Sequence, residues 1–294
     1  MKQLTLSEYL INTYGEKIYK ISLSSGCTCP NRDGTKGTSG CAFCLNGSGE
    51  FATRGDIDFQ FEEAKAKISE KTKAKRFIAY FQSFSNTYGN VEELTKLYKK
   101  VALKEEVAIL SIATRPDCIN DDVIKTLKEL SLIKPVWVEL GLQTANIESA
   151  RKLNLGYDKY DFIKAFNALK EIGVKVIAHV IFSLPDESEE DSLDTVRFLS
   201  ELSPAIDGVK IQMLHVLKGT PLGDRYIEKP FRLYSLEEYG KLLKRALEIL
   251  PESVVIHRIT GDPPRKYLLA PLWTIDKKKT LNYLNKYTIG KGGK

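Results

Sequence analysis

Four of the five cysteines in this 294-residue chain fall within one short segment, at Cys27, Cys29, Cys41 and Cys44, and the fifth is Cys118. An odd number of cysteines, a long chain and an amino terminus without an export signal argue against a disulfide scaffold. Clustered thiols in a reducing compartment are more often metal ligands or redox groups. We therefore expect the chemistry of the protein in this segment.

The loop at residues 25–46 has a spacing suited to an iron–sulfur cluster. Cys41 and Cys44 form a Cys-x2-Cys turn, and Cys29 faces them from across a glycine-rich stretch that can wrap closely around a ligand. Three thiolates can hold a four-iron cluster and leave one iron open to chelate S-adenosylmethionine (SAM), whose reductive cleavage gives a 5′-deoxyadenosyl radical. The spacing alone also allows a structural zinc site, in which Cys27 would be a fourth ligand.

Short β-branched or aromatic runs, alternating with helical patterns, must position this loop. Strands are predicted at 17–23, 76–81, 107–112, 135–140, 174–182 and 208–215. This alternation predicts βα units, a parallel sheet and right-handed connections, so the sheet either curls into a barrel or winds in both directions. No Gly-rich dinucleotide motif or Walker motif is present, which favours the barrel. Six repeats predict an α/β fold, a partial (β/α)6 TIM-type barrel.

The chain divides on this pattern into a barrel at 1–230 and a C-terminal α/β extension at 231–294 packed on it. The extension is predicted to contain a helix from 236, a strand at 254–259 and a last helix from about 276. Because a bare sheet edge invites association, we expect this tail to cover part of the open edge of the barrel. The cysteine loop begins at the carboxyl end of the first strand, where barrel enzymes carry their active sites.

Composition narrows the class of protein further. Lys and Arg number 44 against 38 Asp and Glu, for a net charge of +6, and hydrophobic residues make up 43% of the chain, which excludes disorder. No apolar run reaches the roughly 18 residues that cross a bilayer. The amino terminus has neither signal-peptide nor transit-peptide features, so we expect a cytoplasmic protein without membrane contact. The mild positive charge permits an anionic partner.

The loop Cys29-Pro-Asn-Arg-Asp-Gly-x-x-Gly-x-x-Gly-Cys41-x-Phe-Cys44 resembles that of radical SAM enzymes, in particular the small bacterial group related to the catalytic subunit of elongator. The likeness continues, in register, at residues 80–88, 114–117, 139–144, 214–220 and 258–262. It implies the partial (β/α)6 barrel reached above, without elongator's acetyltransferase domain. Relatives differ at Cys27, at Asn154-Leu-Gly-Tyr157 and at Ser183-Leu-Pro-Asp-Glu187, which leaves the exact substrate open.

The resemblance also implies roles for individual residues. It makes Cys29, Cys41 and Cys44 the cluster ligands. The cofactor-binding candidates are Phe43 beside the adenine, Gln82 at the methionine amine, and Arg115, Glu139 and Gln143 at the carboxylate and ribose. A guanidinium fork suits a carboxylate, which supports Arg115. Cys27 is then an accessory thiol, and Cys118 a packing residue.

Candidate substrate contacts are His179, Lys210 and His215 on the later strands and the run Lys277, Lys278 and Lys279 near the carboxyl terminus. Each also has a structural interpretation: His179 is typical of a satisfied core histidine, and a lysine run is usually a solvated face. On an RNA enzyme these lysines would hold phosphates. Glu139, on a buried strand, needs a partner because an unpaired buried carboxylate is costly.

The resemblance implies an enzyme with a [4Fe–4S] cluster and SAM, supplied with electrons by a donor such as flavodoxin or ferredoxin. It implies tRNA as substrate, with chemistry on the carbon-5 side chain of wobble uridine, for example conversion of carboxymethylaminomethyl to aminomethyl. One alternative is radical chemistry on a small metabolite. Another, from a different class, is a zinc-stabilised RNA-binding protein without catalysis.

Overall fold

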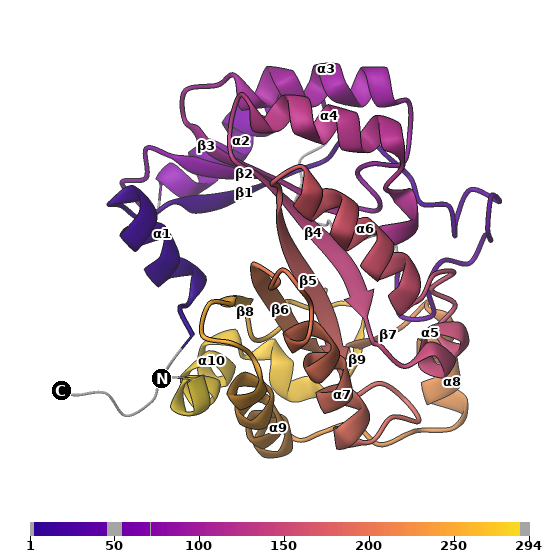
Figure 1. Cartoon of the computed structure of the whole chain (residues 1–294). Coiled ribbons are helices and arrows are strands. Elements are labelled where there is room, and N and C mark those ends of the chain that lie inside the picture. Colours follow the sequence, from indigo (N-terminus) through magenta and orange to yellow (C-terminus); the bar gives the residue numbers. More distant parts are fainter. Residues whose placement is uncertain (1–2, 46–54, 71, 289–294) are drawn as a thin grey trace.

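A single curled sheet of seven parallel strands forms the centre of the computed structural model, which describes residues 3–45, 55–70 and 72–288 (Figure 1). The strand order is β1-β2-β3-β4-β5-β6-β8, and every neighbouring pair is parallel. The strands are β1 (Tyr19–Leu23), β2 (Phe77–Phe81), β3 (Val107–Thr114), β4 (Val136–Gln143), β5 (Lys175–Phe182), β6 (Gly208–Met213) and β8 (Val255–Arg258). All six predicted barrel strands are confirmed. The strand expected at 254–259 also exists, but it extends the sheet beside β6.

The sheet is curled into a partial barrel, as predicted. Lys20 on β1 and Glu139 on β4 are three strands apart in the sheet, yet the Lys20 Nζ lies 2.6 Å from the Glu139 Oε1. Neighbouring strands are about 4.8 Å apart, so a flat sheet would hold these two strands roughly 14 Å apart. The contact therefore requires the concave face of the sheet to close around a polar interior.

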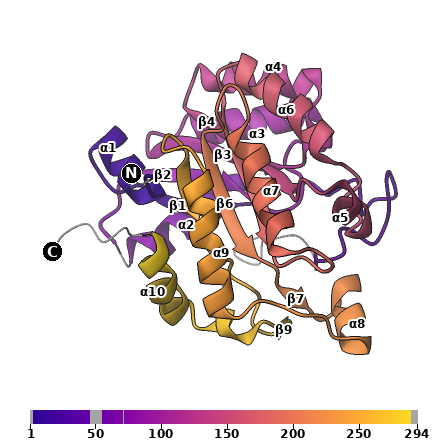
Figure 2. The ribbon, with the colours of Figure 1, turned by 60° about the horizontal axis from the view of Figure 1, so that its bottom comes forward.

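Helices cover the convex face of the sheet, and most of them run outside the strands that they connect (Figures 1 and 2). These helices are α2 (Ile57–Ser69), α3 (Val91–Ala102), α4 (Asp121–Ser131), α6 (Lys159–Glu171), α7 (Glu189–Ser200) and α9 (Leu236–Ile249). The core between the layers is a single large cluster that includes Phe81, Ile112, Val138 and Val176. Strands buried on both faces explain the continuous apolar runs in the sequence.

Helix α1 (Leu6–Tyr14), which the sequence analysis did not predict, closes the amino-terminal end of the barrel. The chain first pairs with the edge strand β8, where Ile256 N donates to Leu4 O at 2.8 Å. It then continues through α1 to β1 at the opposite edge. Leu10 packs with Trp137 and Ile177 in a separate apolar cluster. Helix α1 therefore spans the gap between the two edges of the sheet at its base.

The remaining elements lie at the carboxyl ends of the strands or beside α9. They are α5 (Ile147–Lys152), α8 (Pro221–Glu228), the antiparallel pair β7 (Val216–Leu217) and β9 (Leu268–Ala270), the 3-10 turns Pro116–Cys118 and Leu272–Ile275, and α10 (Lys277–Thr288). Helix α10 packs against α9. No helix within the described residues is long and apolar enough to span a membrane. The sheet includes strands from both predicted units, so their boundary at residue 230 stays a prediction.

Candidate active site

Hydrogen bonds to distant backbone groups attach the cysteine loop to the carboxyl ends of the strands. Ala42 N donates to Leu153 O at 2.8 Å, and Leu222 N donates to Ala42 O at 2.9 Å. The Asn154 side chain donates to Gly40 O at 2.9 Å. The stretch around Cys41 is therefore fixed between the segments that contain α5 and α8.

Asn31 is the central connection between this loop and the rest of the site. Its Nδ2 donates to Asn154 O at 2.6 Å and to Leu155 O at 3.1 Å, and it lies 3.7 Å from the Cys41 Sγ. Gly156 has φ +71°, and a Cβ there would lie 2.8 Å from the Asn31 Oδ1. Only glycine adopts this backbone readily while leaving room for the Asn31 amide.

Arg115, just past β3, connects the carboxylate of Asp117 to a second cysteine. Its Nε and Nη2 donate to the two Asp117 oxygens at 2.9 and 2.8 Å, while its Nη1 lies 3.7 Å from the Cys29 Sγ. The guanidinium also lies over the Tyr157 ring, 4.8 Å from its centroid. Burial would raise the pKa of Asp117, but the hydrogen bonds and charge of Arg115 and Lys36 hold it below its usual value. A fixed cation therefore faces a thiol of the loop.

The five cysteines have different surroundings. Burial raises the pKa of Cys41 to about 12, so metal binding must release a proton from this thiol. Cys27 packs against the core between the sheet and its helices. Cys118 is buried, with its Sγ 4.0 Å from the Asp117 Oδ1. Across residues 3–45, 55–70 and 72–288, no three His, Cys, Asp or Glu side chains are grouped to hold a metal ion. The fit to iron–sulfur chemistry rests on three thiols of one loop. Two of them, those of Cys41 and Cys29, face the N–H donors of Asn31 and Arg115.

Below the loop, the interior of the barrel holds a charged cluster centred on Glu139. Its Oε1 accepts from Lys20 at 2.6 Å and from Ser111 at 2.8 Å. Its Oε2 lies 2.8 Å from the His179 Nε2 and accepts a close hydrogen bond from Lys210. The sequence analysis required a partner for this buried carboxylate, and the structure provides four.

The cluster is held together by complementary charge. Burial would raise the pKa of Glu139, but Lys20 and Lys210, with a hydrogen bond from His179, hold it well below its usual value. Burial, together with the charge of Lys210, lowers the pKa of His179 to about 4. The ammonium groups of Lys20 and Lys210 both lie over the Tyr80 ring, 4.3 and 4.4 Å from its centroid. His179 is therefore a neutral, hydrogen-bonded interior side chain.

The comparisons with known proteins place this architecture in a family. The model of the Radical SAM superfamily matches residues 26–199, and that of the radical SAM C-terminal domain matches residues 206–289. The chain belongs to the radical SAM superfamily. Members of this superfamily use a [4Fe–4S] cluster and SAM, so the protein is a radical SAM enzyme. The non-catalytic zinc alternative is therefore wrong.

Several relatives match along most of this radical SAM chain. YtqA of Bacillus subtilis is 38% identical over 98% of the chain and 90% of its own length. YhcC of Escherichia coli is 33% identical over 95% of the chain and 89% of its own length. Human elongator complex protein 3 is 28% identical over 61% of the chain, which corresponds to 32% of that protein.

The solved structure of Elp3 from the archaeon Methanocaldococcus infernus shares the fold. It aligns with a TM-score of 0.71 and 20% identity over 92% of this chain, which spans 62% of that Elp3 chain. Coproporphyrinogen III oxidase (HemN) of Escherichia coli, described as a radical SAM enzyme, aligns with a TM-score of 0.54 over 80% of this chain. The partial barrel expected from the strand count is thus also the fold of these neighbours.

The cofactor-binding candidates of this radical SAM enzyme lie at two levels of the barrel. Phe43 is half-buried against the apolar cluster at the carboxyl ends. Gln82 follows β2, and its Oε1 accepts from Ser22 at 3.4 Å. Gln143, at the end of β4, has φ +66° and hydrogen-bonds the Tyr157 hydroxyl. Glu139 lies deeper, and its oxygens already accept the four donors named above.

The structure separates the substrate candidates of the enzyme. His179 and Lys210 meet at Glu139, whereas His215 follows β6 and packs against the backbone of Gly261, where a Cβ would lie 2.3 Å from its ring. Lys277 pairs with Asp262 at 2.8 Å. Lys278 and Lys279 line a groove to which Lys277 does not contribute, together with Asn282, Tyr283 and Lys286. The three lysines of the run therefore do not form one common binding surface.

Sequence reasoning missed several residues that the structure places in or beside the site. These are Asn31, Asn154, Lys20, Ser111, Tyr80 and Arg258. Asn31 lies inside the cysteine motif, so its position was a usable signal. Tyr80, Asn154 and Arg258 also lie in segments that the sequence analysis compared with relatives. Lys20 and Ser111 lie outside those segments, and only the curvature of the sheet brings these two to Glu139.

Proposed function

We propose that this radical SAM enzyme binds tRNA and remodels the carbon-5 side chain of wobble uridine, for example by converting carboxymethylaminomethyl to aminomethyl. The supporting observation is the relationship to elongator: 28% identity to human elongator complex protein 3 over 61% of the chain. The shared Elp3 fold over 92% of the chain agrees with it. The enzyme would work in the cytoplasm, where tRNA is available.

In this proposal Cys29, Cys41 and Cys44 hold the [4Fe–4S] cluster. A cluster held by these thiols would supply the electron for the reductive cleavage of SAM. The residues of the chain orient and tune this centre. Arg115 and Asn31 direct N–H groups at the sulfurs of Cys29 and Cys41, and such hydrogen bonds influence the reduction potential of a cluster. An electron donor such as flavodoxin or ferredoxin would complete the system.

The SAM site would be built from side chains at the carboxyl ends of the strands. Phe43 is assigned to the adenine, Gln82 to the amino group and Gln143 to the ribose or carboxylate. Two of the assigned residues have competing partners in the structure: the Arg115 fork holds Asp117, and Glu139 holds the interior cluster. Gln82→Ala should weaken SAM binding, and isothermal titration of the reconstituted enzyme measures this.

The decisive experiment compares modified nucleosides in tRNA from cells with and without the gene. Loss of one wobble-uridine modification, with accumulation of its precursor, supports the proposal. An unchanged nucleoside profile, together with 5′-deoxyadenosine formation by the reconstituted enzyme, would instead favour radical chemistry on a small metabolite.

A further inference from the structure

A cavity of about 570 Å³ lies in the gap between the two edges of the curled sheet. Residues of β1 form one wall, residues of β8 and α10 form the other, and α1 contributes Leu6, Ser7 and Leu10. We call this cavity the lateral slot. Its volume lies within the range of about 300–1,000 Å³ that is typical of small-molecule sites, so it is large enough for one nucleotide unit.

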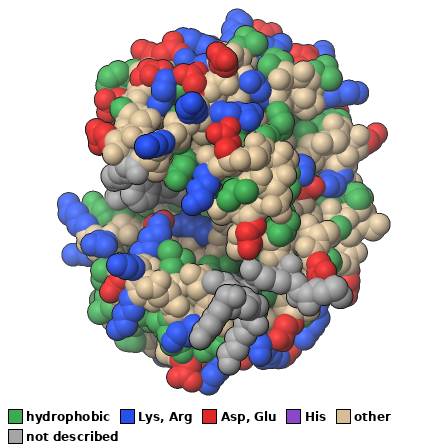
Figure 3. Space-filling model, turned by 90° about the vertical axis from the view of Figure 1, so that its left-hand side faces the viewer, with side chains coloured by type: hydrophobic (Ala, Val, Ile, Leu, Met, Phe, Trp, Pro, Cys, Tyr) green, Lys and Arg blue, Asp and Glu red, His purple; other side chains and the backbone are tan. Residues whose placement is uncertain are grey.

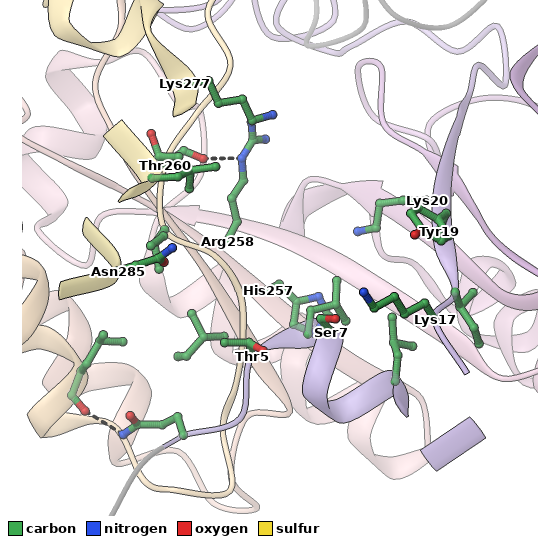
Figure 4. A pocket seen from close by; sticks show the side chains of 18 residues that line it. Thr5, Ser7, Lys17, Tyr19, Lys20, His257, Arg258, Thr260, Lys277 and Asn285 are labelled. Atoms are coloured by element: carbon green, nitrogen blue, oxygen red, sulfur yellow. Dashed lines mark hydrogen bonds between the residues drawn. The ribbon is translucent and has the colours of Figure 1, made fainter. Parts of the chain in front are cut away.

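The lateral slot is lined by positive charge. Lys17 and Lys20 come from the β1 side, and Arg258 and Lys277 come from the opposite side (Figure 4). None of the eighteen lining residues, all in the described part of the chain, is Asp or Glu. On the face that carries α1, Lys and Arg side chains gather around a hollow (Figure 3). An anion in the slot would therefore meet cations from both walls.

These cations outnumber the carboxylates that could neutralise them. Arg258 and Lys277 share Asp262, at 2.9 and 2.8 Å. Lys20 shares Glu139 with Lys210, which is not itself a lining residue. Lys17 adds an exposed ammonium at the rim. The slot therefore keeps a net positive potential, which attracts anionic ligands.

The wall at β8 is preorganised. The Arg258 guanidinium donates to Thr260 O and to Asp262, which fixes the fork beside the slot. The close packing of Gly261 on His215 fixes the loop that carries both partners, because any Cβ at Gly261 would collide with that ring. These two bonds use Nε and Nη2, so the Nη1 group is held in one orientation and is the donor that a phosphate would meet.

We propose that the lateral slot binds the phosphodiester backbone of a single-stranded RNA segment, so that the target base enters the barrel from the side. This inference rests on the proposed function and names the surface that recognises its substrate. Lys17 and Lys277 hold phosphates at the rim, while Lys20 and Arg258 lie further in. Lys20 extends to the Glu139 cluster, so the slot leads toward the barrel interior. The exposed rim accommodates a continuing strand, which a site for a free metabolite would not require.

The experiment measures binding of an anticodon stem-loop RNA to the full-length protein at several salt concentrations. Lys17→Ala/Lys277→Ala is compared with Lys278→Ala/Lys279→Ala, which removes the same charge from the neighbouring groove. The slot variant should lose about 1.4 from the slope of log K against log salt, at roughly 0.7 for each single-strand phosphate. If the proteins bind alike at 1 M salt, this corresponds to roughly 25-fold weaker binding at 0.1 M. The control variant should keep the wild-type slope.

The outcomes separate this inference from the function on which it rests. Wild-type protein that binds no RNA contradicts the proposed function itself. RNA binding that weakens equally in both variants overturns the slot as the recognition surface and leaves the function standing. Weaker binding of uridine 5′-monophosphate in the slot variant, with RNA binding unchanged, would overturn the RNA assignment. Both variants change exposed side chains, so both should keep the wild-type circular dichroism spectrum.

Discussion

The cysteine loop and the Glu139 cluster occupy two levels of one barrel and are held by different kinds of contact. The loop is fixed mainly through backbone groups, to which the amides of Asn31 and Asn154 and the cations of Lys36 and Arg32 donate, and this leaves its thiols available for metal. The cluster is fixed through charge, and both oxygens of Glu139 are already fully used. Reactivity is therefore concentrated in the loop, whereas the Glu139 cluster beneath it maintains the shape of the barrel.

The largest effect should come from the loop cysteines. Cys29→Ala, Cys41→Ala and Cys44→Ala should each abolish the iron–sulfur cluster, because each removes one of only three proposed ligands. Cys27→Ala and Cys118→Ala should retain it, since those thiols pack elsewhere. Iron and sulfide analysis of the five purified variants measures this. A Cys27→Ala protein without iron would show that the loop uses a different ligand set.

Loss of Glu139 should lower the stability of the fold. Glu139→Ala leaves Lys20 and Lys210 without their shared carboxylate inside the barrel, and breaking a buried ion pair typically costs about 3–5 kcal/mol. Urea denaturation gives the loss in free energy of unfolding. Glu106→Ala removes the surface pair with Lys65 and should cost less than about 1 kcal/mol. Equal losses in free energy of unfolding in the two variants would refute the structural role of the Glu139 cluster.

The two levels also differed in how far the sequence could predict them. The cysteine loop is contiguous, so its spacing and motif indicated the chemistry before any fold was known. The Glu139 cluster is assembled from β1, β3, β4, β5 and β6, and no local pattern relates Lys20 to Lys210. The sequence predicted that Glu139 needs a partner, but only the curvature of the sheet determines which residues supply it.

The sequence left two features of the fold unpredicted, for different reasons. Six strands were found by their apolar runs, whereas the place of β8 in the sheet depends on pairing with β6 across long sequence separation. Helix α1 was missed although its capping box, Thr5 with Glu8, is visible in the sequence. At nine residues it is too short for apolar periodicity to identify.

Acid should weaken the barrel interior before it affects the carboxylates. The chain has three histidines, and burial lowers the pKa of His179 and His215 to about 4 and that of His257 further. The unfolded chain binds these protons below about pH 6.5, so the folded state loses stability as the pH falls from there toward 4. By this linkage, each histidine that stays neutral in the folded protein should lower the free energy of unfolding by roughly 2 kcal/mol between pH 7 and 5. A smaller drop in His179→Gln would assign part of it to the cluster; an unchanged drop would exclude His179.

Asn31→Ala should have a modest effect on stability, but its effect on the cofactor separates the cysteine loop from the Glu139 cluster. Asn31→Ala removes two hydrogen bonds to backbone carbonyls, at a cost of about 1–2 kcal/mol, and also removes the amide that faces Cys41. Ser235→Ala removes the N-cap of α9, which packs against α7 and α10 on the outside of the sheet, at a similar cost of about 1 kcal/mol. If Asn31 orients the metal-binding loop, only Asn31→Ala should lose iron faster when the reconstituted protein is exposed to a chelator. Equal rates of iron loss in the two variants would mean that general stability, and not the connection between Asn31 and the loop, retains the cluster.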